Sequence, residues 1–363
     1  MPASDAARLN IIQEGERVLR ICNACRYCEG FCAVFPAMER RRSFAEADLN
    51  YLANLCHNCG ECYYACQYAP PHEFAVNVPK LLAEIRVRSY EKYCWPKFAG
   101  LAFRANGTIA AVLLVLCAWL AVLIVEGSLL SRNFELRFYD IVSHGAMVRL
   151  YGSVSVVILV VFAIGLSRFW RDAGGPVTPA ALARGLKDAL TLHYLDGGGG
   201  GCAYPAEKQS QARRWFHHLA FYGFGLCFAS TVTAAFYHYA LGWIAPYDYL
   251  SIPVILGSAG GIAIVAGTLG LFALKAIRDP QTQDRKQTGM DVSFLLLLLL
   301  SSVSGLLLLA LRESRRMPEL LGLHLGIVLA LFLTLPYGKF VHGIYRSAAL
   351  VKYALERHSG IHR

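Results

Sequence analysis

The sequence predicts a mainly α-helical protein in which a polar, cysteine-rich N-terminal domain precedes a helical membrane domain. Of its 363 residues, 56% are hydrophobic and 17% are charged, whereas ordinary soluble domains are about 45–50% apolar and about 25% charged. Cysteines and charges gather before residue 104, and long apolar runs begin after it. These observations divide the chain into a soluble domain of residues 1–104 and a membrane domain of residues 105–363.

The N-terminal domain contains the same cysteine pattern twice. The spacing Cys-x2-Cys-x2-Cys-x3-Cys begins at Cys22 and again at Cys56. It is the ligand pattern of bacterial two-cluster ferredoxins, in which three cysteines hold one cluster and the fourth binds the other. The sequence therefore predicts two 4Fe–4S clusters. The first takes Cys22, Cys25, Cys28 and Cys66, and the second takes Cys56, Cys59, Cys62 and Cys32.

A pair of zinc sites is the alternative for these cysteines, but zinc has no use for a third Cys-x2 step. Two features separate the domain from the simplest bacterial ferredoxins. Ala33 and Gln67, not proline, follow the fourth cysteine of each motif. Between the motifs, Ser43-x2-Glu46 has the pattern of a capping box, which predicts a helix over residues 44–55. We therefore expect the α-helical ferredoxin type.

The membrane domain contains six apolar runs. A transmembrane helix needs about 20 mostly apolar residues, with a range of about 17–25. The runs cover residues 109–125, 150–166, 216–236, 252–277, 292–311 and 320–337. Buried helices of a large soluble protein are the alternative, but six such runs are hard to bury in any other way. We expect a six-helix transmembrane bundle of the cytochrome b type.

Basic residues predict the orientation of this bundle, because cytoplasmic loops retain lysine and arginine. The connection of residues 168–214 is rich in both, and residues 237–251 contain neither. Both termini, the cysteine domain and the 168–214 loop are therefore expected on the cytoplasmic side of a bacterial-type inner membrane. The cytoplasm is a reducing environment, which disfavours disulfide bonds between the cysteines. The net charge of +10 then reflects topology, and it requires no nucleic-acid partner.

Five histidines lie in or near only two of the runs: His217, His218 and His238 around the third, and His324 and His342 around the sixth. Ionisable groups in a membrane are costly and usually functional, and neutral imidazole is a common haem ligand. No Cys-x2-Cys-His motif is present, so any haem is of the b type. Histidines expected at the same depth in the membrane can share a haem. This criterion pairs His342 with His217 or His218 for an inner haem, and His238 with His324 for an outer one.

Helical geometry favours His217 over His218 as the haem ligand. Around the helix axis, His217 and His238 are about 60° apart, whereas His218 and His238 are about 160° apart. His324 and His342 are expected on the same face of one helix, because a whole number of helical turns separates them. Each histidine has the alternative of being an ordinary polar group at a helix end. Four basic residues at the inner level are candidate partners for haem propionates: Arg213, Arg214, Lys339 and Arg346.

Other features carry less weight. Residues 197–201 are five glycines that lack the GxxxxGK[ST] pattern of a phosphate loop, so we interpret them as a flexible hinge. The following Cys202 has no partner spacing, and His144 is expected at the membrane interface. The sequence contains no Rossmann, catalytic-triad or flavin motif. It therefore indicates no substrate-oxidising site in this chain.

Several stretches together resemble the tricarballylate/citrate utilisation protein B family. They are the paired cysteine motifs, YLxGGGGGC at 194–202, RRWFHHLxFYGF at 213–224 and LPYGKFVHG at 335–343, and the resemblance covers essentially the whole chain. It implies a membrane redox protein beside a cytoplasmic FAD-dependent dehydrogenase of the tricarballylate dehydrogenase type. Such a protein takes electrons from the reduced flavin and passes them towards the quinone pool.

Together these interpretations predict an electron carrier in the lipid bilayer, with two 4Fe–4S clusters, one or two b haems and quinone as acceptor. Two other classes remain alternatives. The first is a haem-free iron–sulfur membrane protein that assists metal or oxidase assembly, and the second is a transporter with a redox-sensing domain. The scarcity of acidic residues within the apolar runs weighs against transport.

Overall fold

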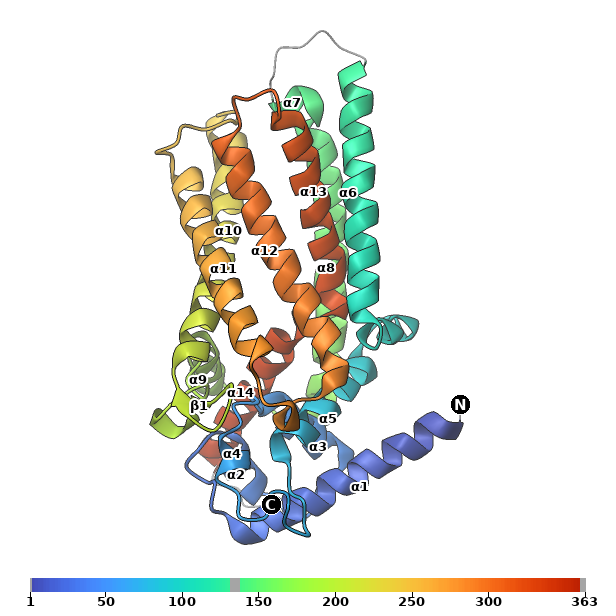
Figure 1. The fold of residues 1–363 in the computed structure, drawn as a ribbon, viewed down its shortest axis with the longest axis vertical. Helices are drawn as coiled ribbons and strands as arrows, with labels where there is room; N and C mark the ends of the chain where they lie inside the picture. The colour runs from blue at the N-terminus through green and yellow to red at the C-terminus, as the bar shows by residue number, and fades with distance from the viewer. Residues whose placement is uncertain (1, 131–137, 360–363) are drawn as a thin grey trace.

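The computed structural model describes residues 2–130 and 138–359, which form a mainly helical protein (Figure 1). A bundle of long, roughly parallel helices stands on a smaller group of helices, which we call the head (residues 2–103). The end of the bundle that contacts the head is the head end, and the opposite one is the far end. The described part contains one sheet, in which β1 (Cys202–Ala203) pairs antiparallel with β2 (Gln209–Ser210).

The head is built from short helices around an apolar core. They are α1 (Pro2–Cys25), α2 (Val34–Glu39), α3 (Glu46–Leu55), α4 (Glu61–Tyr64), α5 (Val78–Tyr93) and the 3-10 helix η1 (Lys97–Phe103). The helix predicted over residues 44–55 begins two residues late, at Glu46, so the predicted capping box is wrong. The carboxylate of Asp48, one turn in, accepts the Ala45 N–H at 3.2 Å and caps the helix there.

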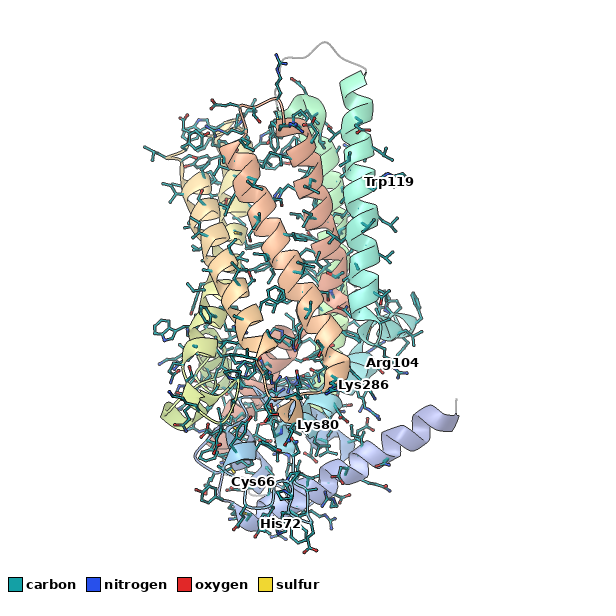
Figure 2. All side chains as sticks on the ribbon, in the orientation of Figure 1. Cys66, His72, Lys80, Arg104, Trp119 and Lys286 are labelled. Atoms are coloured by element: carbon teal, nitrogen blue, oxygen red, sulfur yellow. The ribbon has the colours of Figure 1, made fainter. Side chains whose placement is uncertain are left out.

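Six long apolar helices form the bundle, as predicted. They are α6 (Asn106–Leu130), α8 (His144–Ala173), α10 (Ala212–Leu241), α11 (Ile252–Ala276), α12 (Thr288–Ala310) and α13 (Met317–Thr334). Large apolar side chains face outward, among them Trp119 (Figure 2), which is 61% exposed. Helices of this length and composition can cross a membrane. The fold therefore indicates a membrane protein.

The sixth apolar run does not continue to His342. Helix α13 ends at Thr334, the 3-10 turn η5 (Leu335–Tyr337) follows, and α14 (Val341–Ser359) starts as a new helix. Pro336 has no N–H to donate, which favours a helix break here. The prediction that one helix face joins His324 to His342 is therefore wrong.

Helix α14 joins the bundle to the head. Its Tyr345 stacks on Tyr90 of α5 with ring centroids 5.7 Å apart, and its Ala349 is fully buried in the core shared with the head. On its other side α14 packs against α9 (Pro179–Leu190), an amphipathic helix in the connection between α8 and α10. The short helix α7 (Phe138–Ile141) lies at the far end (Figure 1).

Candidate metal centres

The first cysteine set lines a hollow in the head. Cys22 and Cys25 lie on the last turn of α1, Cys28 in the turn that follows, and Cys66 just after α4. The hollow has a volume of about 270 Å³ and also borders Cys62. Burial, and then the neighbouring thiols of Cys66, Cys28 and Cys25, raise the pKa of Cys22 to about 12. The structure thus brings together the four predicted ligands of the first cluster.

The second set lies beside the first and is more deeply buried. Cys32, Cys56, Cys59 and Cys62 line a smaller hollow. Burial raises the pKa of the Cys32 thiol well above its usual value, and the nearby Cys59 and Cys56 raise it further. Because Cys62 borders both hollows, the two predicted cluster sites adjoin each other.

The cysteines stand apart rather than converging on one point. Within residues 2–130 and 138–359, no three His, Cys, Asp or Glu side chains are placed to hold a single metal ion. A 4Fe–4S cluster makes no such demand, because each of its four thiolates binds a different iron atom. Five cysteines line the first hollow, because Cys62 also borders it, and four line the second. Their thiols supply the donors that two clusters in the predicted 3 + 1 arrangement would need.

Arginines from the bundle hold the backbone of the second cysteine loop. Arg346 of α14 donates to the Cys56 carbonyl at 2.8 Å. Arg213 of α10 donates to the carbonyls of His57 and Asn58 at 3.0 and 2.8 Å. A third arginine, Arg278, donates to the Asn58 side chain at 3.0 Å. Sequence reasoning missed Arg278, which belongs to no motif and lies 220 residues from Asn58.

The four basic residues predicted as propionate partners all have partners within the protein. Arg213 and Arg346 bind the cysteine loop, and Arg214 donates to the Thr191 carbonyl at 3.2 Å. The ammonium of Lys339 lies 2.6 Å from the Asp291 carboxylate. Burial lowers the pKa of Lys339 to about 8, although Asp291 opposes that shift. Each of the four basic groups is thus held by a contact within the protein, and their role towards haem propionates stays a prediction.

Two of the histidines meet at the head end. The rings of His217 on α10 and His342 on α14 have centroids 6.1 Å apart and planes at 79°. Nδ1 of His342 lies 2.5 Å from the Lys339 carbonyl, which can only accept, so Nδ1 carries the hydrogen and Nε2 is left with its lone pair. His218 instead places Nε2 3.2 Å from the Thr191 carbonyl. The structure thus pairs His342 with His217.

The far end is arranged differently. The ring of His238 stacks on that of His144 with centroids 3.8 Å apart and planes at 21°. Nδ1 of His324 lies 3.0 Å from the Ser304 hydroxyl of α12. The two histidines predicted to share an outer haem therefore have separate partners. His144, which we expected at the membrane interface, is the neighbour of His238.

The glycine-rich segment is not an open hinge, because it packs on both cysteine motifs. Gly198 has φ +79°, and a Cβ there would lie 2.9 Å from the Gly30 carbonyl. Gly60, in the second motif, touches the same segment: its Cβ would lie 2.5 Å from the Ala203 carbonyl. Gln209 of β2 donates to Glu61 of α4 at 2.5 Å. The glycines permit close backbone approach, which replaces the hinge interpretation.

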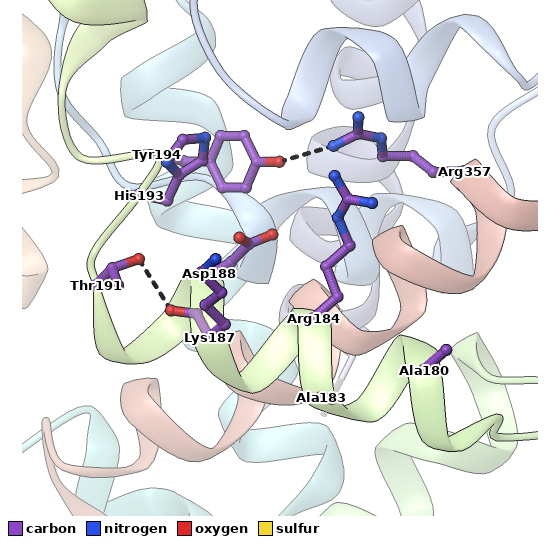
Figure 3. Close-up of a pocket in the computed structure, with 9 residues that line it drawn as sticks. All are labelled: Ala180, Ala183, Arg184, Lys187, Asp188, Thr191, His193, Tyr194 and Arg357. Carbon is purple, nitrogen blue, oxygen red and sulfur yellow. Dashed lines mark hydrogen bonds between the residues drawn. The ribbon is translucent and has the colours of Figure 1, made fainter.

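A separate, open pocket of about 590 Å³ lies between α9 and α14. Arg184, Lys187 and Asp188 point into it from one face of α9, and Arg357 reaches towards Tyr194 from α14 (Figure 3). The Arg357 guanidinium donates to the Tyr194 hydroxyl at 3.5 Å. The residues that line it include none of the predicted ligands, so it is distinct from the metal centres.

Comparisons with known proteins match both parts of the chain. The family model described as citrate utilization protein B matches residues 101–361. A second, the citrate utilization protein B Fer4-like domain, matches residues 15–92. The citrate utilization protein B of Escherichia coli is 50% identical over 353 residues, which cover 96% of this chain and 93% of that protein. No solved structure matches the chain.

Proposed function

Because this chain belongs to the citrate utilization protein B family, we propose that it is a membrane-bound electron-transfer protein of carboxylate utilisation. Its electron donor is the reduced flavin of an FAD-dependent dehydrogenase of the tricarballylate type, and its acceptor is a membrane quinone. Bound 4Fe–4S clusters and b-type haem supply the one-electron carriers between them. The Fer4-like domain and the six apolar helices support this proposal.

The cysteines of the head are the proposed cluster ligands. Cys22, Cys25, Cys28 and Cys66 hold the cluster nearer the protein surface, and Cys32, Cys56, Cys59 and Cys62 hold the one nearer the bundle. The first hollow opens beside Tyr27, which is 69% exposed. A protein partner therefore has its best access at the first set, and the second set lies between that entrance and the membrane.

One observation carries the proposal: the same two helices hold the second cysteine loop and the head-end histidine pair. Arg213 and His217 are four residues apart on α10, and so are His342 and Arg346 on α14. Residues at that spacing share a helix face, one turn apart. Each helix thus places an arginine on the cysteine loop and a histidine one turn towards the bundle.

The histidine pair would hold a haem iron through one ring nitrogen each, because neutral imidazole is a common haem ligand. The observed separation of the His217 and His342 rings is 6.1 Å. A metal-binding histidine usually donates its other ring N–H to a fixed acceptor, and His342 does so towards Lys339. We assign these two residues as the haem ligands.

The proposed orientation places the head in the cytoplasm at the inner membrane. Basic residues of the 168–214 connection lie at the head end, around α9 and the start of α10, as the preference for cytoplasmic lysine and arginine requires. Under this proposal the cluster domain of residues 1–104 receives electrons from the dehydrogenase. The membrane domain of residues 105–363 delivers them to quinone.

The first test is a reduced-minus-oxidised visible spectrum of the detergent-solubilised protein, with iron and haem assayed on the same sample. We expect sharp b-type bands over a broad iron–sulfur bleach and about eight non-haem irons per chain, as two 4Fe–4S clusters require. Reduced flavin should reduce both kinds of centre, and a soluble quinone analogue should reoxidise them.

Loaded clusters without a haem band would overturn the haem assignment and favour the assembly-factor alternative. Reduction by flavin without reoxidation by quinone would overturn the assignment of quinone as acceptor. A protein that holds zinc in place of iron would overturn the electron-transfer function as a whole.

A further inference from the structure

Helix α9 has an apolar face that the described residues leave uncovered. Leu182, Leu186 and Leu190 recur at every fourth position, so they share one face of the helix. Their exposed fractions are 44%, 43% and 50%. The neighbouring face is closed, because Gly185 is buried against the backbone of Val351 on α14. A contiguous exposed apolar face of this kind marks an interaction surface.

The opposite face of α9 is polar and turns towards the head. At about 100° per residue, Arg184 lies about 200° around the helix axis from Leu186. Arg184, Lys187 and Asp188 line the open pocket beside Tyr194 (Figure 3). Tyr194 in turn packs against the apolar core that α14 shares with the head. The leucines on the other side of α9 therefore face away from the head.

The C-terminal end of α9 is bonded to α10, a helix that can cross a membrane. The Tyr222 hydroxyl donates to the Leu190 carbonyl at 2.8 Å, and Arg214 donates to the Thr191 carbonyl at 3.2 Å. Beside these contacts, Trp215 is 68% exposed and Tyr222 is 49% exposed. Exposed tryptophan and tyrosine at the end of an apolar helix are typical of the boundary between lipid and water. Helix α9 therefore ends at the level expected for the membrane surface.

We propose that α9 is an interfacial membrane helix whose three leucines lie among the lipid acyl chains at the head end of the bundle. Lipid is the occupant because the neighbouring α10 also exposes apolar side chains, among them Leu219 and Phe221, so the leucine face continues the outward surface of the bundle. An amphipathic helix places its apolar face in the region between headgroups and acyl chains and keeps its basic face in water.

This placement has a consequence for the rest of the head end. Because α9 packs against α14, a lipid surface that holds α9 also supports the helix that carries His342 and Arg346. The inference goes beyond the proposed electron-transfer function, and no metal centre enters it.

The experiment measures the quenching of tryptophan fluorescence by brominated lipid, with the full-length protein in lipid nanodiscs. Leu186→Trp places a tryptophan on the leucine face, and Arg184→Trp places one on the opposite face of the same helix as the matched control. The bromine lies on the acyl chains, either close to the headgroup or close to the chain end. The emission of the wild-type protein, whose five tryptophans set the background, is subtracted. We expect the added emission of Leu186→Trp to be quenched several-fold more strongly than that of Arg184→Trp, and most strongly by bromine close to the headgroup.

A second measurement needs no substitution. The wild-type protein is placed in nanodiscs that contain a phospholipid with a photoreactive diazirine on its acyl chain, and the adducts are located by peptide mass spectrometry after irradiation. We expect adducts on residues 179–190 and on α6 around Trp119, which is 61% exposed. We expect none on α3, whose residues are largely buried in the head.

Equal, weak quenching in both variants would overturn the inference, and so would adducts on α6 without any on residues 179–190. Either result would favour a protein partner on the leucine face. Equal, strong quenching in both variants, or quenching that is strongest near the chain end, would also overturn it, because α9 would then lie within the membrane core. If a variant fails to fold, the photolabelling of the wild-type protein decides. No readout depends on iron or haem, so a failure here is separate from a failure of the proposed function.

Discussion

The two ends of the helical bundle use histidine in different ways. At the head end, His217 and His342 come from two helices that also hold the second cysteine loop, and their rings are 6.1 Å apart. At the far end, His238 stacks on His144 at 3.8 Å, and His324 bonds to Ser304. The two head-end rings stand nearly perpendicular and apart, with planes at 79°, whereas the far-end rings are stacked in direct contact.

This difference shows that equal expected depth in a bundle does not bring two histidines together, because His238 and His324 have separate partners. A pair also needs helices turned towards each other and a fixed ring. At the head end the arginine contacts set the rotation of α10 and α14, and the Lys339 carbonyl fixes the ring of His342. The far-end histidines are held by each other or by a serine hydroxyl, so we expect one haem rather than two.

The largest expected effect is the loss of haem on changing the head-end pair. His342→Ala or His217→Ala removes one proposed axial ligand, and we expect the purified protein to lose its b-type bands. His324→Ala is the matched control, because this histidine is also buried in the bundle but bonds to Ser304. The measurement is haem per chain in the three variants. Haem retained in His342→Ala, or lost in His324→Ala, would contradict the proposed difference between the two ends of the bundle.

A smaller effect is expected from the link between α14 and the cysteine loop. Arg346→Met leaves the Cys56 carbonyl without its buried donor. Loss of a hydrogen bond from a charged group typically costs about 1.5–3 kcal/mol. Arg357→Met on the same helix is the control, since Arg357 is exposed, its hydrogen bond to Tyr194 is long and its guanidinium lies 5.8 Å from the centre of the Tyr353 ring. Thermal unfolding followed by the iron–sulfur absorbance should show a lower midpoint for Arg346→Met only. Equal midpoints would mean that this arginine does not support the loop.

The packing that holds α14 is also testable. A Cβ on Gly185 of α9 would lie 2.6 Å from the backbone of Val351 on α14, so Gly185→Ala must push the helices apart. Such overpacking typically costs about 1–3 kcal/mol. Gly152→Ala, in the bundle helix α8, meets nothing within 4 Å and should be neutral or slightly stabilising. The measurement is the thermal unfolding midpoint of the two variants. Equal midpoints would show that α9 moves away from α14 without a loss of stability.

The sequence contains the information for features that depend on short stretches of chain. Apolar run length predicts the six bundle helices, and the cysteine spacing predicts groups such as Cys22, Cys25 and Cys28, which the structure places around one hollow. Contacts between distant segments leave no local pattern. Arg278 and Cys202 reach the second cysteine loop only because the bundle and the glycine-rich segment fold onto the head. The stacking of His238 on His144 depends in the same way on the position of α8.

The smallest expected effect concerns the far end. Ser304→Ala removes the hydroxyl that bonds Nδ1 of His324. Because that bond joins two neutral groups, we expect a loss of about 0.5–1.5 kcal/mol in stability and no change in haem content or in the visible spectrum. Ser153→Ala is the control, since its hydroxyl bonds only the Leu150 carbonyl of its own helix. A change in the spectrum of Ser304→Ala would mean that His324 is a ligand after all, and that the two ends of the bundle are more alike than their contacts indicate.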